Sequence, residues 1–491
     1  MMLLGFKIVV GAVWLALTIY TVGHVMLHKS NAASAWGWIV SCLLMPFVGP
    51  GLYALFGINR VQTRARKRRM PRTPAGDVGS AHEADARRRR AADRPAVPSA
   101  LSEVARTGDV VTRRPLLDHN RLEILHNGEQ VYPRMLAAID AAQASVALMV
   151  YIFETDEVGQ QFVDALQRAQ ARGVQVRCLL DGIGEFAWKR AGSVLFEHGL
   201  IVARFNPLRF WPPFLHVNLR NHRKVLVVDG QIGFAGGMNI SVNHLADRFD
   251  NPCRITDVHI EIHGPVLAQL VQVFADDWAY ASGEEWSPPQ APKVDTPPSS
   301  TAAEPDIVDS TICRVITDGP NEDYAQLSLV LLAAINAAHR HIHVVVPYFL
   351  PPAEIMMALQ SAALRGVLVD IILPLEHDQI LTHYAARNQF EPLLERGVRV
   401  YYQPPPFCHA KLFVVDGHYA QFGSANLDPR SLRLNFELMV EVFDADFAGR
   451  LAEHCVELRD KAHRITREEM RARPLFARLR DALCWLFGPY L

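Results

Sequence analysis

Two stretches of the chain repeat one pattern of polar residues ahead of an apolar run. They read NHRKVLVVDG at residues 221–230 and CHAKLFVVDG at residues 408–417. Each has a His, a Lys two positions later, an Asp seven positions after the His, and then a Gly. Small residues and an Asn follow both, as GGMN at 236–239 and GSAN at 423–426. One such stretch is compatible with a polar strand edge, but two with the same spacing predict two half-sites that make one active site.

The sequence around these stretches also repeats. In the first half an apolar run at 146–153 precedes a helical pattern at 159–172, and in the second half a run at 342–349 precedes one at 353–365. Helices that alternate with apolar strands predict an α/β fold with covered sheets. The expected boundaries are residues 106–283 for the first domain, 284–310 for a proline-rich linker and 311–465 for the second domain.

Length and cysteine usage limit the broad class of the protein. A chain of 491 residues can form two or three domains, and its net charge of -1 averages over very uneven segments. The 7 cysteines are scattered, and no two of them form a CxxC pair. This pattern favours reduced thiols facing a cytosol over a disulfide framework or a zinc site.

Residues 1–60 predict a transmembrane helical hairpin. An apolar run at about 8–26 can span a hydrocarbon core of about 30 Å, and a second run covers about 33–57. The alternative for the first run is a cleaved signal peptide. That alternative is disfavoured because the run is too long, no small-residue cleavage site closes it, and a second run follows at once. Pro46 and Pro50 predict that the second run is kinked or partly re-entrant.

A basic cluster follows the apolar runs, between Arg60 and Arg72. The positive-inside bias places this end of the hairpin, and with it the N-terminus, in the cytoplasm. The same charges would attract anionic headgroups by about 1 kcal/mol each. Residues 61–105 lack apolar periodicity and predict a basic flexible tether. We therefore expect a multi-pass membrane protein with its catalytic domains on the cytoplasmic side.

Strand geometry predicts which side chains of the first stretch share a face. An Asp-Gly pair between apolar runs is a strong hairpin signal. A two-residue turn at this pair puts Lys224 opposite Ala235 and His222 opposite Gly237. Because side chains alternate between faces, His222, Lys224 and Asn239 should lie on one face.

The same count applies to the second stretch. It puts His409 opposite Ser424, with Lys411 and Asn426 on that face. Each half then offers an imidazole, an ammonium group and a carboxamide around small residues. This arrangement predicts a phosphate-sized pocket of hydrogen-bond donors that uses no metal and no cofactor.

The Asp of each stretch, Asp229 or Asp416, falls in the hairpin turn by this count. These two residues are therefore expected to be structural rather than chemical. The acids that orient the histidines should come from elsewhere, and Asp257 and Glu437 hold roughly matching positions in the repeat. A carboxylate on one ring nitrogen fixes the tautomer of a histidine and leaves the other nitrogen to react.

The paired H-x-K-x4-D patterns, each followed by G-[GS]-x-N, resemble the phospholipase D superfamily over residues 122–460. The resemblance implies two tandem phospholipase D-like domains with mixed sheets and a pseudo-twofold axis. It also implies a phosphoryl-histidine intermediate, with His222 as nucleophile and His409 as acid and base. The implied catalytic set is His222, Lys224, Asp229, His409, Lys411 and Asp416, with Asn239, Asn426 and Ser424 binding phosphate and Asp257 and Glu437 orienting the histidines.

Further features resemble bacterial cardiolipin synthases: the two N-terminal apolar runs, PYFLP at 347–351, and GSANLDPRS at 423–431. That family transfers a phosphatidyl group from one phosphatidylglycerol to another and releases glycerol. The resemblance implies phospholipid substrates, contact with the bacterial inner membrane, no cofactor and no nucleic acid partner. One departure is Gly237, which stands where Ser is usual in the first motif, while Ser424 keeps it in the second.

Two apolar segments have two interpretations each. Residues 466–491 predict an amphipathic helix, with Leu479 and Leu483 on its apolar face. The helix either lies in the membrane interface, which its aromatic tail favours, or packs on the catalytic core. The segment Phe210–Leu215, with sequence FWPPFL, forms either a rim where lipids gain access or a packed loop.

Three other functions compete with phosphatidyl transfer between lipids. A phospholipase D that hydrolyses its substrate, or that uses another alcohol, has the same motifs. A membrane-tethered nuclease is disfavoured by the two apolar runs and by two motif copies in one chain. A non-catalytic lipid-binding scaffold is disfavoured because both motifs are complete.

Overall fold

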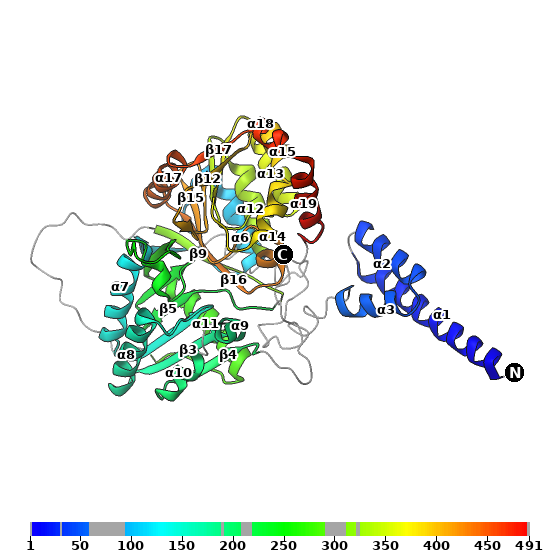
Figure 1. Ribbon diagram of the computed structural model, residues 1–491. Helices are drawn as coiled ribbons and strands as arrows, with labels where there is room; N and C mark the ends of the chain where they lie inside the picture. Colours follow the sequence, from blue (N-terminus) through cyan, green and yellow to red (C-terminus); the bar gives the residue numbers. More distant parts are fainter. Residues whose placement is uncertain are drawn as a thin grey trace, which may run out of the picture. The chain divides into compact units, whose positions relative to one another are not determined.

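The computed structural model describes residues 2–29, 32–57, 94–187, 191–207, 219–289, 311–320 and 325–488. The chain divides into two compact units, Met1–Arg68 and Arg69–Leu491, and each is described by itself (Figure 1). The basic cluster after the apolar runs, most of the expected tether, the segment at 210–215 and most of the expected linker lie outside the described residues.

Among its described residues, the first unit contains one helix long enough to cross a membrane. Helix α1 (Met2–His28) includes a segment of 24 residues, Gly5–His28, with a mean hydropathy of 1.9. The second apolar run instead forms α2 (Ala32–Leu44), α3 (Val48–Leu52) and a π-helical turn. The run breaks at Pro46, whose nitrogen cannot donate, and at the following residue, whose φ is 63°. A single continuous second span is therefore absent from the described residues.

The second unit is built on one large sheet. Fifteen of the described strands join in the order β17-β12-β11-β10-β14-β15-β16-β9-β1-β8-β6-β5-β2-β3-β4. At the centre, β1 (Leu117–His126) pairs antiparallel with β9 (Thr311–Asp318). The remaining strands are β2 (Ser145–Val150), β3 (Gln175–Asp181), β4 (Val202–Phe205), β5 (Val225–Val228), β6 (Ile232–Gly236), β8 (Val258–His263), β10 (His341–Val345), β11 (Leu368–Pro374), β12 (Arg399–Gln403), β14 (Leu412–Val415), β15 (Tyr419–Gly423), β16 (Glu437–Phe443) and β17 (His463–Ile465).

The first seven strands on each side of this centre follow the same order, which confirms the tandem α/β repeat, and β17 adds one strand at the edge of the second half. From the centre outward, the first half runs β1-β8-β6-β5-β2-β3-β4, and the second runs β9-β16-β15-β14-β10-β11-β12. The outer strands β2, β3 and β4 are parallel, as are β10, β11 and β12, while the inner strands are antiparallel. Both halves therefore have the expected mixed sheet.

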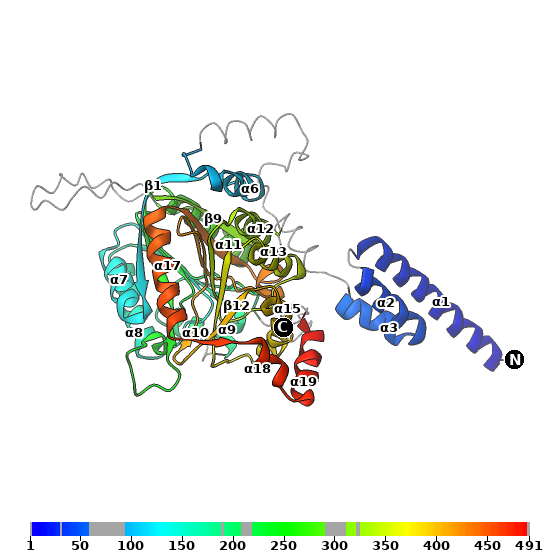
Figure 2. The ribbon, with the colours of Figure 1, turned by 90° about the horizontal axis from the view of Figure 1, so that it is seen from above.

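Helices cover both faces of the sheet in each half (Figures 1 and 2). In the first half α7 and α8 pack against each other on one face of the sheet. Helix α11 packs against the strands apart from this pair. In the second half α12 and α13 correspond to α7 and α8, and α17 corresponds to α11. Their bounds are α7 (Asn127–Ala141), α8 (Glu157–Ala171), α11 (Leu267–Ser282), α12 (Gln326–Ala337), α13 (Ala353–Leu364) and α17 (Ala445–Asp460).

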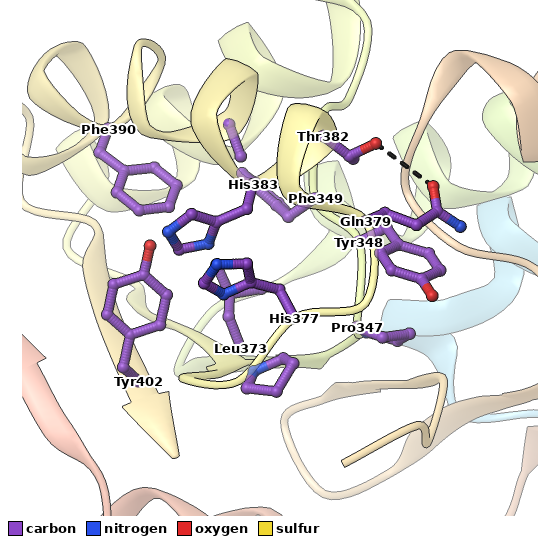
Figure 3. A pocket seen from close by; sticks show the side chains of 12 residues that line it. Pro347, Tyr348, Phe349, Leu373, His377, Gln379, Thr382, His383, Phe390 and Tyr402 are labelled. Atoms are coloured by element: carbon purple, nitrogen blue, oxygen red, sulfur yellow. Dashed lines mark hydrogen bonds between the residues drawn. The ribbon is translucent and has the colours of Figure 1, made fainter. Parts of the chain in front are cut away.

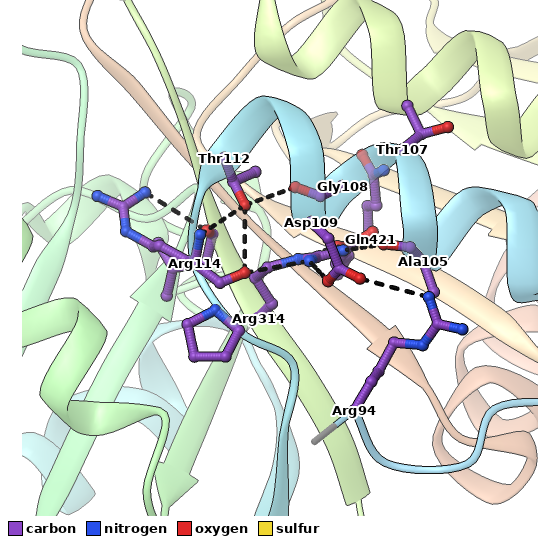
Figure 4. Close-up of polar contacts among 12 residues, drawn as sticks. Arg94, Ala105, Thr107, Gly108, Asp109, Thr112, Arg114, Arg314 and Gln421 are labelled. Atoms are coloured by element: carbon purple, nitrogen blue, oxygen red, sulfur yellow. Dashed lines mark hydrogen bonds and ion pairs between the residues drawn. The ribbon is translucent and has the colours of Figure 1, made fainter. Parts of the chain in front are cut away.

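The segment before the first half is anchored in the second half. Helix α6 (Ser102–Thr112), which begins inside the expected tether, packs on α12. Fully buried Arg314 on β9 holds it, because the guanidinium lies 2.6 Å from Asp109 of α6 and 2.6 Å from Glu441 of β16 (Figure 4). A Cβ at Gly108 would lie 1.9 Å from this guanidinium, so α6 needs glycine there. Two carboxylates and two carbonyls compensate the buried charge.

The register of the motif hairpins differs from the expectation by one residue. Val228 pairs with Ile232, not with Gln231, and Val415 pairs with Tyr419. The turn residue Asp229 has a φ of 54° and the following glycine a φ of 67°, and one further residue completes each loop. The predicted pairing of Lys224 with Ala235 is therefore wrong, since Val225 pairs there.

The C-terminal helix packs on the second half, as one of the two interpretations expected, and also has an exposed apolar side. After α18 (Arg467–Ala472), helix α19 (Leu475–Leu486) packs on α14 (Ile380–Arg387). Its inward side includes fully buried Asp481, which pairs with Arg473 and Arg480. Its other side is apolar and exposed, at Leu475, Phe476, Leu479, Leu483, Leu486 and Phe487.

Candidate active site

Short backbone contacts bring the two motif histidines to the junction of the halves. The backbone N–H of His222, just before β5, donates to the carbonyl of Phe436 at 2.9 Å. The N–H of His409, just before β14, donates to Thr256 at 2.8 Å, where β7 (Ile255–Thr256) pairs with β13 (Phe407–Cys408). Each accepting carbonyl belongs to the residue directly before an acid of the opposite half.

The two predicted orienting acids therefore serve the histidines crosswise. His222 Nδ1 donates to Glu437 Oε2 at 3.1 Å, and His409 Nδ1 donates to Asp257 Oδ2 at 2.9 Å. Both carboxylates are buried. This geometry favours the tautomer with hydrogen on Nδ1 and leaves each Nε2 available to react. The repeat indicates the two acids, but not that each acid contacts the histidine of the other half.

The motif lysines are buried beside the histidines. Lys224 Nζ donates to the carbonyl of His222 at 2.7 Å, and Lys411 Nζ makes the matching contact with His409. Burial lowers the pKa of Lys411 to about 8, although Asp257 and Glu437 act to raise it. Burial also holds the pKa of Lys224 well below its usual range. Lysine side chains in one enclosed site attract an anion strongly when they are charged, and a bound anion in turn raises their pKa.

The same burial keeps the imidazoles neutral. Burial lowers the pKa of His222 to about 4, against the raising effect of Glu437. Burial and the charge of Lys411 lower the pKa of His409 to about 3. Burial acts to raise the pKa of Asp257, but the hydrogen bond from His409 and nearby positive charges outweigh it and hold that pKa low. The site therefore contains neutral imidazoles against ionised carboxylates, which suits nucleophilic attack.

The motif aspartates lie in the hairpin turns, as expected from the count. Asp229 accepts hydrogen bonds at 2.8 Å from three consecutive backbone N–H groups at 143–145, where β2 begins. Asp416 does the same for residues 339–341, where β10 begins. Each Asp lies seven positions after its His, which in a largely extended chain is a distance of about 20 Å. These contacts tie the hairpin to the neighbouring strand.

The other predicted site residues differ in what their side chains contact. Asn239 is buried, and its carboxamide oxygen accepts from the N–H of Ile152 at 3.2 Å. Asn426 is also buried, and its carboxamide oxygen has no partner among the described residues. The hydroxyl of Ser424 donates to Glu437 at 2.5 Å, which commits this hydrogen to the orienting acid.

Two aromatic residues near the histidines were missed by sequence reasoning. The ring of Tyr151 lies 5.0 Å from that of His222, and Lys224 Nζ lies 5.2 Å from the Tyr151 centroid. The ring of His244 lies 6.2 Å from that of His409. One signal was available for the tyrosine, because the repeat aligns Tyr151 with Tyr348.

A separate cluster has the composition of a metal site. The ligand atoms of His341, His343 and Asp370 lie within 4.8 Å of one another on β10 and β11. However, Arg399 and Arg459 both contact the Asp370 carboxylate, at 2.5 and 3.4 Å. Two guanidinium charges at this carboxylate oppose a cation, so the residues fit a structural network better than a metal centre.

Comparisons with known proteins agree with this geometry. The family model described as cardiolipin synthase, PLD-like domain, matches residues 135–278 and 331–458. A model described as phospholipase D-nuclease N-terminal matches residues 16–57. Cardiolipin synthase A of Pseudomonas aeruginosa strain LESB58 is 34% identical over 448 residues, which cover 87% of this chain and 84% of the relative. Cardiolipin synthase of Geobacillus kaustophilus is 31% identical over 473 residues, which cover 95% and 91%.

A solved structure shares the fold. The phosphatidylserine synthase of Haemophilus influenzae Rd KW20 aligns with a TM-score of 0.58 and 15% identity, covering 79% of this chain and 100% of that one. At this identity the likeness concerns the fold alone. With two motif copies at one junction, a family match over both halves and relatives aligned along most of the sequence, the chain belongs to the cardiolipin synthase family with PLD-like domains.

Proposed function

We propose that the protein is a cardiolipin synthase. It transfers a phosphatidyl group from one phosphatidylglycerol to the terminal hydroxyl of a second and releases glycerol. The observation that carries this proposal is the crosswise contact of His222 with Glu437 and of His409 with Asp257. Two oriented imidazoles beside two buried ammonium groups suit a reaction that breaks and remakes a phosphodiester.

In the first step, His222 Nε2 attacks the phosphorus of the donor lipid. The bond between phosphorus and the glycerol oxygen breaks as a bond between phosphorus and nitrogen forms. Protonated His409 gives its Nε2 hydrogen to the departing glycerol oxygen. Lys224 and Lys411 stabilise the negative charge on the phosphoryl oxygens, with the amide groups of Asn239 and Asn426.

In the second step, His409 acts as the base. It takes the hydrogen of the acceptor hydroxyl while that oxygen attacks the phosphatidyl-histidine. The bond between phosphorus and nitrogen breaks, and its electron pair returns to His222. For the first step His409 must be protonated. The negative charge of a bound phosphodiester favours this protonation, since it raises the pKa of His409 from about 3.

The roles of three residues follow from their contacts. Asp229 and Asp416 hold the hairpins, each through three backbone hydrogen bonds. Ser424 supports Glu437 rather than binding phosphate, since its hydroxyl already donates to that carboxylate.

The membrane contact has two parts. Helix α1 anchors the chain in the inner membrane, and the second apolar run crosses or re-enters it beside α1. The basic residues between Arg60 and Arg72 then keep the catalytic domains on the cytoplasmic side. The exposed apolar side of α19, together with exposed Ile380 and Leu381 on α14, rests in the interface.

The products formed from phosphatidylglycerol alone test the proposed reaction. The purified full chain should form cardiolipin and glycerol in equal amounts, and the His222→Ala and His409→Ala variants should form neither. Phosphatidic acid without cardiolipin would identify a hydrolase instead.

Lipid crosslinking tests the interfacial contact. With a photoreactive benzoylphenylalanine at Leu479, the full chain in vesicles should crosslink to phospholipid. The matched position is Glu453, which is exposed on α17 and should not crosslink. Equal crosslinking at both positions would contradict the proposed orientation.

A further inference from the structure

A large cavity opens beside His409 and has no role in the proposed chemistry so far. Its volume is about 660 Å³, and its walls come from both halves. Protein cavities of about 300–1,000 Å³ usually accommodate a small-molecule ligand. His409 and His244 line it, whereas His222 and both motif lysines do not. The cavity therefore adjoins the residue that exchanges hydrogen with the departing and incoming hydroxyl groups.

The wall from the first half includes an arginine, Arg254, and a carboxylate, Glu154. Arg254 lines the cavity, and among the described residues no acidic side chain forms an ion pair with it. Its Nη1 donates to the carbonyl of Ala246 at 3.1 Å, and its guanidinium carbon lies 4.6 Å from the Phe249 ring centroid. These two contacts hold the side chain in place and leave other guanidinium hydrogens to donate to a ligand.

The backbone fixes Arg254 relative to His409. Arg254 directly precedes β7, which pairs with β13 across the junction of the halves. His409 follows β13, and its N–H donates to β7 at Thr256. The arginine and the acid-base histidine are thus attached to the two strands of one ladder, which keeps their spacing constant.

The wall from the second half carries carboxylates at Glu376 and Asp378. The hydroxyl of Tyr348 donates to Asp378 at 2.7 Å, which orients this carboxylate. Tyr348 belongs to the PYFLP segment, and Figure 3 shows its ring beside the side chain of Gln379. Carboxylate oxygens accept hydrogen bonds from hydroxyl groups.

We propose that this cavity is the subsite for the acceptor lipid, with Arg254 binding its phosphate. Glu376 and Asp378 accept hydrogen bonds from the glycerol hydroxyls. This inference rests on the proposed function, in which the acceptor is an anionic phospholipid with a glycerol headgroup. In that molecule a three-carbon glycerol separates the phosphate from the attacking hydroxyl, so a cation is needed a short distance beyond His409.

The subsite explains how a lipid hydroxyl competes with water. The acceptor oxygen bonds to phosphorus, the bond from phosphorus to His222 breaks, and the hydroxyl hydrogen moves to His409. Water can undergo the same step but has no phosphate to bind. Arg254 therefore stabilises the reaction with the lipid and not the reaction with water.

The ratio of cardiolipin to phosphatidic acid tests the role of the arginine. In Arg254→Ala, made in the full chain and assayed in mixed micelles of detergent and phosphatidylglycerol, cardiolipin formation should fall by about tenfold, with hydrolysis unchanged. Arg254→Lys should recover part of the ratio. Arg248→Ala is the matched control, because this nearby arginine pairs with Glu157 outside the cavity lining and should keep the ratio.

Two outcomes would overturn the role of Arg254. In the first, the ratio of cardiolipin to phosphatidic acid is the same in Arg254→Ala as in the wild type. In the second, the amounts of both products fall equally, as expected of a structural residue. A wild-type enzyme that forms phosphatidic acid alone would instead disprove the proposed function, so the two failures are distinguishable.

The reverse reaction distinguishes the role of the carboxylates from the role of the arginine. With cardiolipin as donor, free glycerol is the acceptor and carries no phosphate. Asp378→Asn and Glu376→Gln should raise the KM for glycerol, by about tenfold for the former, while Arg254→Ala should leave it unchanged. An unchanged KM in both carboxamide variants would remove the carboxylates from the subsite, and a raised KM in Arg254→Ala would contradict phosphate binding.

Discussion

The two histidine centres share a backbone arrangement but differ in how their acids are held. Glu437, which orients His222, also accepts from the Ser424 hydroxyl at 2.5 Å and from the Asn435 amide at 3.1 Å. Asp257, which orients His409, accepts in addition only from the N–H of Val258 among the described residues, at 2.8 Å. One acid is therefore held by three side chains and the other by one.

The difference originates at one position of the repeat. Where the second half has Ser424, the first half has Gly237, and a Cβ there would lie 2.7 Å from Asp257 Oδ1. The shorter acid and the glycine fit together, as do the longer acid and the serine. A nucleophile must return to one position in every cycle, whereas an acid-base residue must exchange hydrogen. The firmer support around His222 thus agrees with its proposed role as nucleophile.

The largest expected effect comes from removing each histidine. His222→Ala and His409→Ala should each lower kcat by at least about 10³-fold. With a labelled nitrophenyl phosphatidyl ester, whose leaving group needs no proton, His409→Ala should accumulate a phosphatidyl adduct at His222. Peptide mapping of the label checks this result. An adduct at His409 in the His222→Ala variant would reverse the assignment.

The next effect concerns the two acids. Glu437→Gln and Asp257→Asn should each lower kcat with phosphatidylglycerol by about 10³-fold, because the histidine loses its fixed tautomer. With the nitrophenyl ester only Asp257→Asn should recover activity, since that substrate does not need a general acid. Single-turnover rates with both substrates provide the measurement. Equal recovery by both variants would mean that the two centres are equivalent.

The pH dependence of the reaction distinguishes the contribution of Lys411 from that of His222. The pKa of Lys411 is lowered to about 8, so its positive charge is lost as the pH rises through that value. We expect kcat/KM to fall by about tenfold for each pH unit above it. Lys411→Arg keeps its charge and should move this alkaline limb upward. On the acid side, protonation of His222 near its pKa of about 4 should stop attack in both enzymes. An alkaline limb that Lys411→Arg leaves in place would contradict this origin.

The smallest effect tests the asymmetry itself. Ser424→Ala removes one hydrogen bond to a buried carboxylate and should lower kcat about tenfold or less. Gly237→Ala forces the Asp257 carboxylate to shift and should have an effect of similar size, but only with substrates that need a general acid. Comparing phosphatidylglycerol with the nitrophenyl ester measures this selectivity. A Gly237→Ala enzyme with full activity on both would show that the glycine has no role.

Local sequence patterns were sufficient for the repeat and for most of the residues that the structure brings together at the junction of the halves. The runs at 146–153 and 342–349 became β2 and β10, and the acids at 257 and 437 follow from matching positions in the repeat. The crosswise contacts could not be predicted from the sequence, because they join residues that are 152 and 215 positions apart. No local periodicity encodes such pairing.

Two other features depend on details that patterns do not fix. The hairpin register shifted by one residue because the loop holds one residue beyond the Asp-Gly pair. Helix α19 packs on the second half with a side that includes Asp481 and exposes its apolar residues on the other side. The buried carboxylate of Asp481 forms ion pairs with arginines instead of being hydrated. Amphipathicity alone does not indicate which side of such a helix faces the core.

The pairing of β1 with β9 has an evolutionary consequence. An active site on the axis of a symmetric dimer of identical chains carries the same residue on both sides at every position. Here both halves belong to one polypeptide, joined through a common sheet. A mutation can therefore alter one side only, as with glycine at 237 and serine at 424. In a single chain, selection can specialise one histidine for the proposed attack and the other for the proposed proton transfer.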